Sequence, residues 1–139
     1  MKVLSLSLEN FRNFEREEIS FSEGTNVITG QNAQGKTNLL EAVYLLCLGR
    51  SFRTRFDREL INFGSDFAAV AARIEAQERQ QRIEISLRRG QRKRILQNGV
   101  KKTAGELQSA LKTVLFCPDD LSIIKSGAAE RRRLLDTAI

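Results

Sequence analysis

The chain of 139 residues contains no histidine and no tryptophan, and it has one proline and two cysteines. Because histidine is absent, Ser-His-Asp triads and histidine-ligated metal sites are excluded. Cys47 and Cys117 lie in apolar stretches without the spacing of metal ligands. We therefore expect two buried free thiols in a reducing compartment rather than a disulfide.

Long apolar runs are also missing. No stretch of about 18 apolar residues occurs, so no membrane span is expected. The N-terminal segment alternates apolar and polar residues, which is typical of a strand and not of a signal peptide. Repeats and Pro/Gly/Ser-rich linkers are absent, and the length is that of one domain over residues 1–139. These features predict a single cytoplasmic domain.

Charge is unevenly distributed along the chain, whose formal net charge is +6. Residues 73–102 hold ten Lys or Arg and three Glu, which gives +7, and the other 13 basic and 14 acidic residues sum to −1. Such asymmetry suggests a polyanionic partner, although a charge run is more often a solvated face.

The hydrophobic pattern predicts a mixed α/β architecture. Short alternating or apolar runs predict strands at residues 4–8, 19–21, 26–30, 67–76, 81–89 and 114–117. Asn98-Gly99 predicts a tight hairpin turn. Helical spacing predicts helices over 37–48, from the capping-box sequence at Thr103 to Val114, and over 129–139, with a short helix after Asp57.

The segment "GQNAQGKT", residues 30–37, fits the phosphate-loop pattern G-x-x-x-x-G-K-[ST] between an expected strand and an expected helix. Two glycines allow a sharp turn and a close approach of backbone amides to phosphate. Lys36, the candidate catalytic residue, would reach the β- and γ-phosphates, and the Thr37 hydroxyl would bind Mg²⁺. The expected ATP-binding residues are Gly30, Gln31, Asn32, Ala33, Gln34, Gly35, Lys36, Thr37 and Asn38.

Hydrolysis would require an acid that holds Mg²⁺ and a group that activates water. "VLFCPDD" offers Asp119 and Asp120 after a short apolar run, in outline like a Walker B strand. Pro118 interrupts that run, no second acid-base group is identifiable, and the start of a capped helix after a buried strand is the preferred interpretation of the acids. Whether the chain turns over ATP is therefore left open.

Three segments resemble the RecF family, an SMC-like branch of the ABC-type ATPases. They are "LSLENFRNFE", "TNVITGQNAQGKTNLLEAVYLLCLGRSFRT" and "FCPDDLSIIKSGAAERRRLLD". Arg131, Arg132 and Asp136 match the family pattern, whereas Ser126, Ala128 and Leu134 depart from it. The resemblance implies an α/β P-loop NTPase fold, an ABC-ATPase-like lobe I with a mixed parallel and antiparallel sheet around the P-loop helix.

The same resemblance implies a function. RecF-family proteins bind DNA in an ATP-dependent way, dimerise on ATP, and act with RecO and RecR to help load RecA at gapped DNA in recombinational repair, replication and the SOS response. It implies a weak, DNA-stimulated ATPase for the complete protein and no turnover by this chain alone. We expect the chain to be an N-terminal ATP-binding lobe without the Walker B acids, signature loop and arm domain.

Residue roles follow from the resemblance as well. The "FRNF" loop lies beside the nucleotide in SMC-like ATPases, so Arg12 and Asn13 are candidate nucleotide contacts. Asn32 would help to shape the phosphate loop, and Asp119 is a candidate metal ligand.

The basic segment supplies the candidate DNA contacts Arg88, Arg89, Arg92, Lys93 and Arg94 on an expected hairpin, and "GRSFRTRFDR" adds Arg53. A solvated, charged hairpin is the competing interpretation. Phe52 and Phe56 are expected as core anchors rather than base-stacking platforms.

Two other functions are compatible with the residues. A small P-loop kinase would transfer phosphate to a metabolite, with Asp119 or Asp120 as the Mg²⁺ acid and the arginine-rich segment as a lid. A DNA-binding module with a vestigial phosphate loop is the third possibility.

Overall fold

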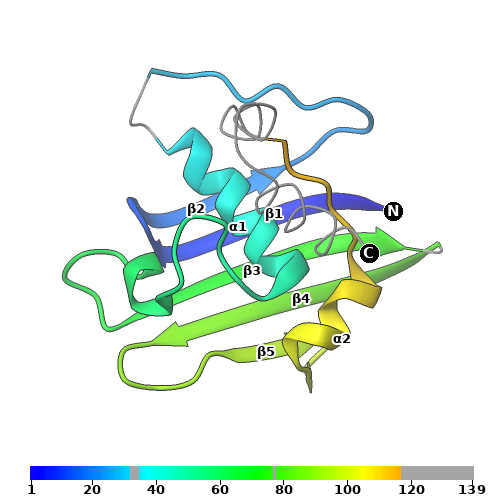
Figure 1. Ribbon diagram of the computed structural model, residues 1–139. Helices are drawn as coiled ribbons and strands as arrows, with labels where there is room; N and C mark the ends of the chain where they lie inside the picture. Colours follow the sequence, from blue (N-terminus) through cyan, green and yellow to red (C-terminus); the bar gives the residue numbers. More distant parts are fainter. Residues whose placement is uncertain (32–34, 77, 117–139) are drawn as a thin grey trace, which may run out of the picture.

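The computed structural model describes residues 1–31, 35–76 and 78–116. Its centre is a six-stranded sheet in the order β2-β1-β3-β4-β5-β6, in which every neighbouring pair is antiparallel (Figure 1). The strands are β1 (Lys2–Phe11), β2 (Phe14–Ser20), β3 (Phe67–Ala76), β4 (Arg79–Arg88), β5 (Arg94–Gln97) and β6 (Val100–Lys101).

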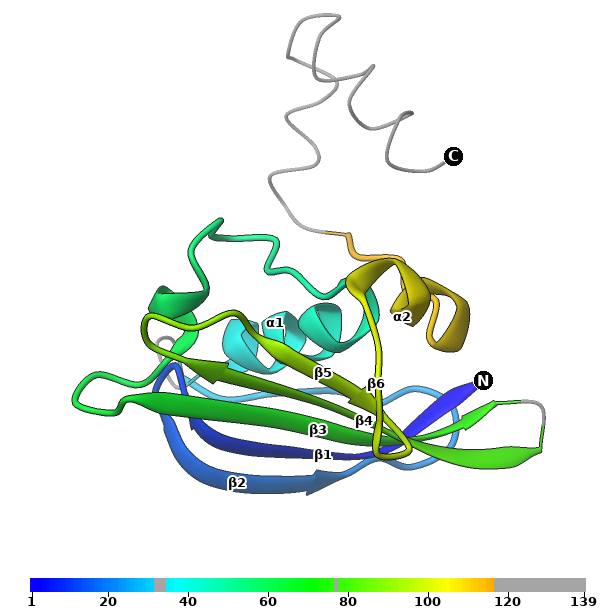
Figure 2. The same cartoon turned by 90° about the horizontal axis from the view of Figure 1, so that it is seen from below.

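Two helices, α1 (Lys36–Leu48) and α2 (Ala104–Ala110), cover the same face of this sheet (Figure 2). A short 3₁₀ helix, η1 (Asp57–Leu60), lies between α1 and β3 in the chain. The core forms where α1 and α2 meet the sheet, because alternate strand residues and the buried side of each helix point into that layer. Its largest fully buried apolar side chains are Phe11, Leu6, Leu8, Leu45, Leu46, Leu60, Ile74, Ile83, Ile85, Leu87 and Leu107.

Most local predictions are confirmed. The alternation of β3 and β4 places Val70 opposite Ile85 in the core, and Asn98-Gly99 joins β5 to β6 with both residues at positive φ. Thr103 and Glu106 form the predicted capping box at the start of α2. That helix ends at Ala110, earlier than the apolar spacing predicted.

Two predicted strands are wrong. Residues 26–30 form no strand, and the side chain of Val27 is 80% exposed. Residues 114–116 also form none, and Val114 is 97% exposed. An apolar run becomes a strand only when a neighbouring strand takes up its backbone hydrogen bonds. Within the described residues no strand pairs with either run. Every strand pair among these residues is antiparallel, so the parallel part of the predicted mixed sheet is not found in them.

Phe56 is also not a core anchor. It lies on the surface, and the guanidinium carbon of Arg58 lies 5.1 Å from the centre of its ring. Phe52 is half-buried and makes an edge contact with Tyr44. In the part of the chain that the structure describes, no helix is both long and apolar enough to cross a membrane.

Candidate nucleotide-binding site

The phosphate loop leads directly into α1. Gly35 caps the helix with φ of 100°, a conformation that favours glycine, and its carbonyl accepts the hydrogen bond from the amide of Leu39 at 3.0 Å. The Lys36 ammonium donates to the carbonyl oxygens of Gly30 and Gln31, the latter at 2.8 Å, so the lysine side chain folds over the loop. Thr37 is exposed at the helix start. These residues place cationic and amide donors at the positive end of a helix, an arrangement that suits phosphate.

The turn between β1 and β2 lies against this loop. A Cβ atom built on Gly35 would lie 2.6 Å from Cζ of Phe14 and 2.9 Å from Oδ1 of Asn13. The glycine is therefore required both by its φ angle and by the space. The turn that contains "FRNF" and the phosphate loop are thus neighbours, and Arg12 and Asn13 lie at the candidate site.

A chain of side-chain hydrogen bonds runs from this turn along α1. Asn38 donates through Nδ2 to Oδ1 of Asn13 at 2.7 Å. Its own Oδ1 accepts from Nη1 of Arg53 at 2.7 Å. Three predicted site residues from three segments are thereby brought together.

Glu41 is the site residue that sequence reasoning missed. Its side chain is 0% exposed, although glutamate is ordinarily a surface residue. It accepts hydrogen bonds from Arg12 at 2.8 and 2.7 Å, from Ser51 at 2.5 Å and from Arg53 at 3.3 Å. An acid within a helix that is apolar on most sides was the available signal, because such an acid must be paired when it is buried.

Burial alone would raise the pKa of Glu41, but the hydrogen bonds and charges of Arg12, Ser51 and Arg53 outweigh it and hold that pKa below its ordinary value. Glu41 is therefore a carboxylate at neutral pH, and it binds both arginines.

A pocket of about 680 Å³ opens beside this network. Arg12, Asn13, Asn38 and Arg53 line one part of it. The rest comes from η1, from the segment after η1, where the side chain of Phe63 is 99% exposed, and from Arg89 after β4. Its full lining is Arg12, Asn13, Asn38, Arg53, Arg58, Glu59, Ile61, Asn62, Phe63 and Arg89. Cationic, amide and aromatic groups are the kinds that bind phosphate, ribose and a base.

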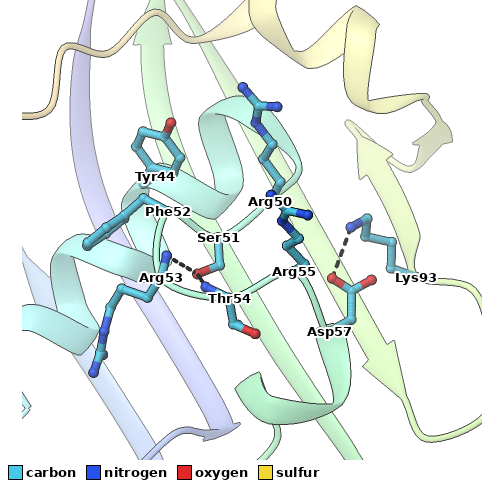
Figure 3. A pocket seen from close by; sticks show the side chains of 9 residues that line it. All are labelled: Tyr44, Arg50, Ser51, Phe52, Arg53, Thr54, Arg55, Asp57 and Lys93. Atoms are coloured by element: carbon cyan, nitrogen blue, oxygen red, sulfur yellow. Dashed lines mark hydrogen bonds and ion pairs between the residues drawn. The ribbon is translucent and has the colours of Figure 1, made fainter. Parts of the chain in front are cut away.

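A second pocket, of about 840 Å³, lies between the segment after α1 and the start of β5 (Figure 3). Lys93 reaches across to Asp57, with Nζ and Oδ1 3.0 Å apart, while Arg50 and Arg55 line the same pocket (Figure 3). Arg53 lines both pockets.

The predicted basic hairpin is the β4–β5 connection. Arg88, Arg89, Arg92 and Arg94 are exposed there, whereas Lys93 is half-buried in its ion pair with Asp57. A further pocket, lined by the 55–58 segment and the hairpin residues Arg88, Gly90, Gln91 and Arg92, shows that the two basic segments are adjacent.

Several predicted residues lie outside the described part of the chain. They are Asn32, Ala33 and Gln34 in the phosphate loop, together with Cys117, Asp119, Asp120, Arg131, Arg132 and Asp136. Within residues 1–31, 35–76 and 78–116, no group of three Cys, Asp or Glu side chains is arranged to hold a metal ion.

Comparison with known proteins identifies the family. A family model for the AAA domain matches residues 5–130, which is most of the chain. The chain belongs to the AAA domain family. Among its curated relatives, the DNA replication and repair protein RecF of Thermoanaerobacter sp. (strain X514) is 46% identical over 140 residues. RecF of Acetivibrio thermocellus (strain ATCC 27405) is 43% identical over the same length.

These AAA-domain relatives are considerably longer than the chain. All of this chain is matched, but it spans 39% of the Thermoanaerobacter protein and 38% of the Acetivibrio protein. The predicted resemblance to RecF is confirmed over the whole of this sequence.

Solved structures agree with the sequence matches. The structure of the recombination mediator protein RecF-ATPrS in the RecFOR pathway superposes with a TM-score of 0.90 at 40% identity, over 97% of this chain and 37% of that one. A structure from work on the ATP-driven dimerisation and DNA-stimulated activation of SMC ATPases has a TM-score of 0.80 at 24% identity, which shows the fold alone. The predicted fold class, an ABC-type P-loop ATPase lobe, is confirmed. None of these relatives supports the kinase alternative.

Proposed function

We propose that this chain is the ATP-binding lobe of a RecF-type protein that binds DNA in an ATP-dependent way and assists RecA loading at gaps. One observation carries the proposal: at the start of α1 the Lys36 ammonium folds back over the carbonyl groups of Gly30 and Gln31, which belong to the same phosphate-loop motif. Support comes from RecF relatives and from RecF structures described with ATP and with ATPrS.

The nucleotide would occupy the loop and the adjoining pocket of about 680 Å³. Lys36 and the amides at the start of α1 would bind the phosphates, and Arg12, Asn13 and Asn38 would lie beside them. The residues fit the ligand, because the Lys36 ammonium lies over the carbonyl groups of Gly30 and Gln31 at the N-terminal, positive end of α1. Thr37 would supply a hydroxyl ligand for Mg²⁺, which neutralises charge on the phosphates, and Asp119 remains a candidate second ligand.

DNA would lie on the basic surface made by the β4–β5 hairpin and the segment after α1. Arg88, Arg89, Arg92 and Arg94 are exposed on the hairpin, and Lys93 and Arg53 line the adjoining pocket. Neutralisation of DNA phosphates by such side chains is independent of base sequence. Lys93 and Arg53 already bind Asp57 and Glu41, so the four exposed arginines are the primary contacts.

The complete protein would act in the cytoplasm as a homodimer with ATP between two subunits, and with RecO and RecR as partners. A weak, DNA-stimulated ATPase activity would belong to that dimer. Since an ATP-sandwiched dimer needs residues from both subunits, we expect this chain alone to bind ATP without appreciable turnover.

Titration with a fluorescent ATP analogue tests the proposal. The unmodified chain should bind Mg-ATP, and Lys36→Ala should weaken binding at least tenfold, since it removes a charge-assisted contact to phosphate. Lys2→Ala is the matched control, because Lys2 lies on β1 and its ion pairs are with Glu23 and Glu75, neither of which belongs to the phosphate-loop motif. A folded chain that does not bind the analogue would refute the proposal, and rapid turnover by the monomer would instead favour a self-sufficient enzyme.

A further inference from the structure

Glu41 is a buried charge for which the phosphate loop offers no explanation. It lies in the second turn of α1, and its side chain is 0% exposed. An apolar residue of similar size would fill the same space without a charge to compensate. The reason for a carboxylate at this position therefore lies in the side chains that donate hydrogen bonds to it.

Those groups come from two different segments on either side of α1. Arg12, in the turn between β1 and β2, binds both carboxylate oxygens, through Nε at 2.8 Å and Nη2 at 2.7 Å. Ser51 and Arg53, in the segment after α1, bind at 2.5 and 3.3 Å. A two-point contact fixes the plane of the Arg12 guanidinium as well as its distance.

The backbone of Arg12 is itself held in an unfavourable conformation. Its φ is 55°, in the left-handed region that non-glycine residues rarely adopt. Its amide donates to the carbonyl of Leu60 at 2.8 Å, and its Nη1 donates to the carbonyl of Glu59 at 2.8 Å. Such conformations persist where the surrounding structure enforces them, and they occur often at functional sites.

Arg53 connects the same carboxylate to the phosphate loop. Its Nη1 also donates to Asn38, which in turn donates to Asn13, and the Asn13 amide lies against Gly35. Arg12, Arg53, Asn38 and Asn13 all line the pocket of about 680 Å³. Glu41 therefore binds Arg12 and Arg53, which line the pocket, but does not line the pocket itself.

We propose that Glu41 is a positioning residue, whose carboxylate holds the guanidinium groups of Arg12 and Arg53 in the wall of the pocket where they meet the triphosphate. This proposal rests on the proposed ATP-binding function and extends it to one residue. Arginines that are already ordered lose less conformational freedom when the anion binds, so nucleotide affinity depends on a residue that does not touch nucleotide.

A double-mutant cycle tests this role. Dissociation constants for a fluorescent ATP analogue with Mg²⁺ are measured for the unmodified chain, Glu41→Gln, Arg12→Ala and the double variant, and thermal unfolding is recorded for each. Glu17→Gln on β2, whose side chain is exposed, is the matched control. We expect Glu41→Gln and Arg12→Ala each to weaken binding about tenfold, and the double variant to fall well short of the hundredfold product of these effects, because only the contact of Glu41 with Arg53 remains to be lost once Arg12 is gone.

The outcomes are distinct. If folded Glu41→Gln binds within about twofold of the unmodified chain, or if the two single effects multiply in the double variant, the positioning role is refuted. If Glu41→Gln does not fold, Glu41→Asp decides, because it keeps the buried charge and withdraws the carboxylate by one methylene. Glu41→Asp should lose affinity as well, and normal affinity with lowered thermal stability would make Glu41 purely structural. An unmodified, folded chain that binds no nucleotide would refute the proposed function and this proposal with it.

Discussion

At the scale of single residues, Gly35 combines two demands that only glycine meets. Its φ of 100° is unfavourable for other residues, and an added Cβ would lie 2.6 Å from the ring of Phe14. Gly64, with φ of 88°, has nothing within 4 Å of the same position. We expect Gly64→Ala to cost about 1 kcal/mol of unfolding free energy, from φ alone, and Gly35→Ala about 3 kcal/mol, from φ and overpacking.

Urea unfolding of the two alanine variants measures this difference. The loss at Gly35 should be accompanied by weaker ATP binding, because the loop would move, whereas Gly64→Ala should bind normally. Equal losses of stability in the two variants would contradict the close packing of the turn on the phosphate loop.

Cys47 gives a residue-scale prediction for pH. Burial in α1 raises the pKa of its thiol to about 11, from an ordinary value of 9.0. A group whose pKa is raised in the folded state stabilises the fold fully below its unfolded pKa, and this contribution is lost as pH rises through the folded value. The unmodified chain should therefore lose up to about 3 kcal/mol between pH 9 and 11 from this thiol alone.

The comparison with Cys47→Ala isolates that contribution from the other groups that titrate at high pH. Urea unfolding under reducing conditions should show a smaller loss between pH 9 and 11 in the variant. An identical pH dependence in both proteins would show that the folded thiol titrates normally.

At the scale of elements, the short helix α2 depends on its first turn. Thr103 donates its backbone N–H to Oε2 of Glu106 at 2.7 Å within a capping box, which also lowers the pKa of Glu106 to about 2. Thr103→Ala should cost about 1 kcal/mol, whereas Gln108→Ala, on the exposed side of the helix, should be nearly neutral.

Denaturant unfolding at pH 7 and at pH 3 checks the cap. Because the pKa of Glu106 is lowered, its contribution is present above its ordinary value of 4.5 and declines as pH falls toward 2. The difference between Glu106→Gln, which cannot ionise, and the unmodified chain should therefore shrink at pH 3, and a constant difference would contradict the lowered pKa of Glu106.

At the scale of the whole molecule, we expect the exposed arginines of the β4–β5 hairpin to bind DNA at one end of the sheet. Reversal of Arg88, Arg92 and Arg94 to glutamate should lower the slope of log affinity against log salt by about 2 to 3, since each phosphate contact contributes about 0.9. The matched control reverses Arg79, Arg82 and Lys101, which are exposed at the opposite end of β4 and on β6.

Duplex DNA binding over a range of salt concentrations distinguishes the two triple variants, which carry equal changes in charge. An equal effect of both would mean that net charge, rather than this surface, governs the binding. An unchanged slope in the hairpin variant would remove Arg88, Arg92 and Arg94 from the interface.

Local pattern predicted most of the fold. Helical spacing located α1 to within one residue, and alternation located β1, β3 and β4, because period and burial are tied together in these elements. The phosphate-loop motif could be recognised for a similar reason, since its eight residues are consecutive, and phosphate binding by these residues stays a proposal. The failures at residues 26–30 and 114–116 both concern apolar runs whose state depends on a partner strand.

The sequence by itself determined the phosphate-loop motif, the helix that follows it and the alternating strands, because each depends on residues within a few positions of one another. Only the tertiary structure decided that Glu41 is buried, and that Arg12 from 29 positions earlier and Arg53 from 12 positions later bind it. A buried carboxylate is stable only with partners at hydrogen-bonding distance, and the fold alone brings those partners together.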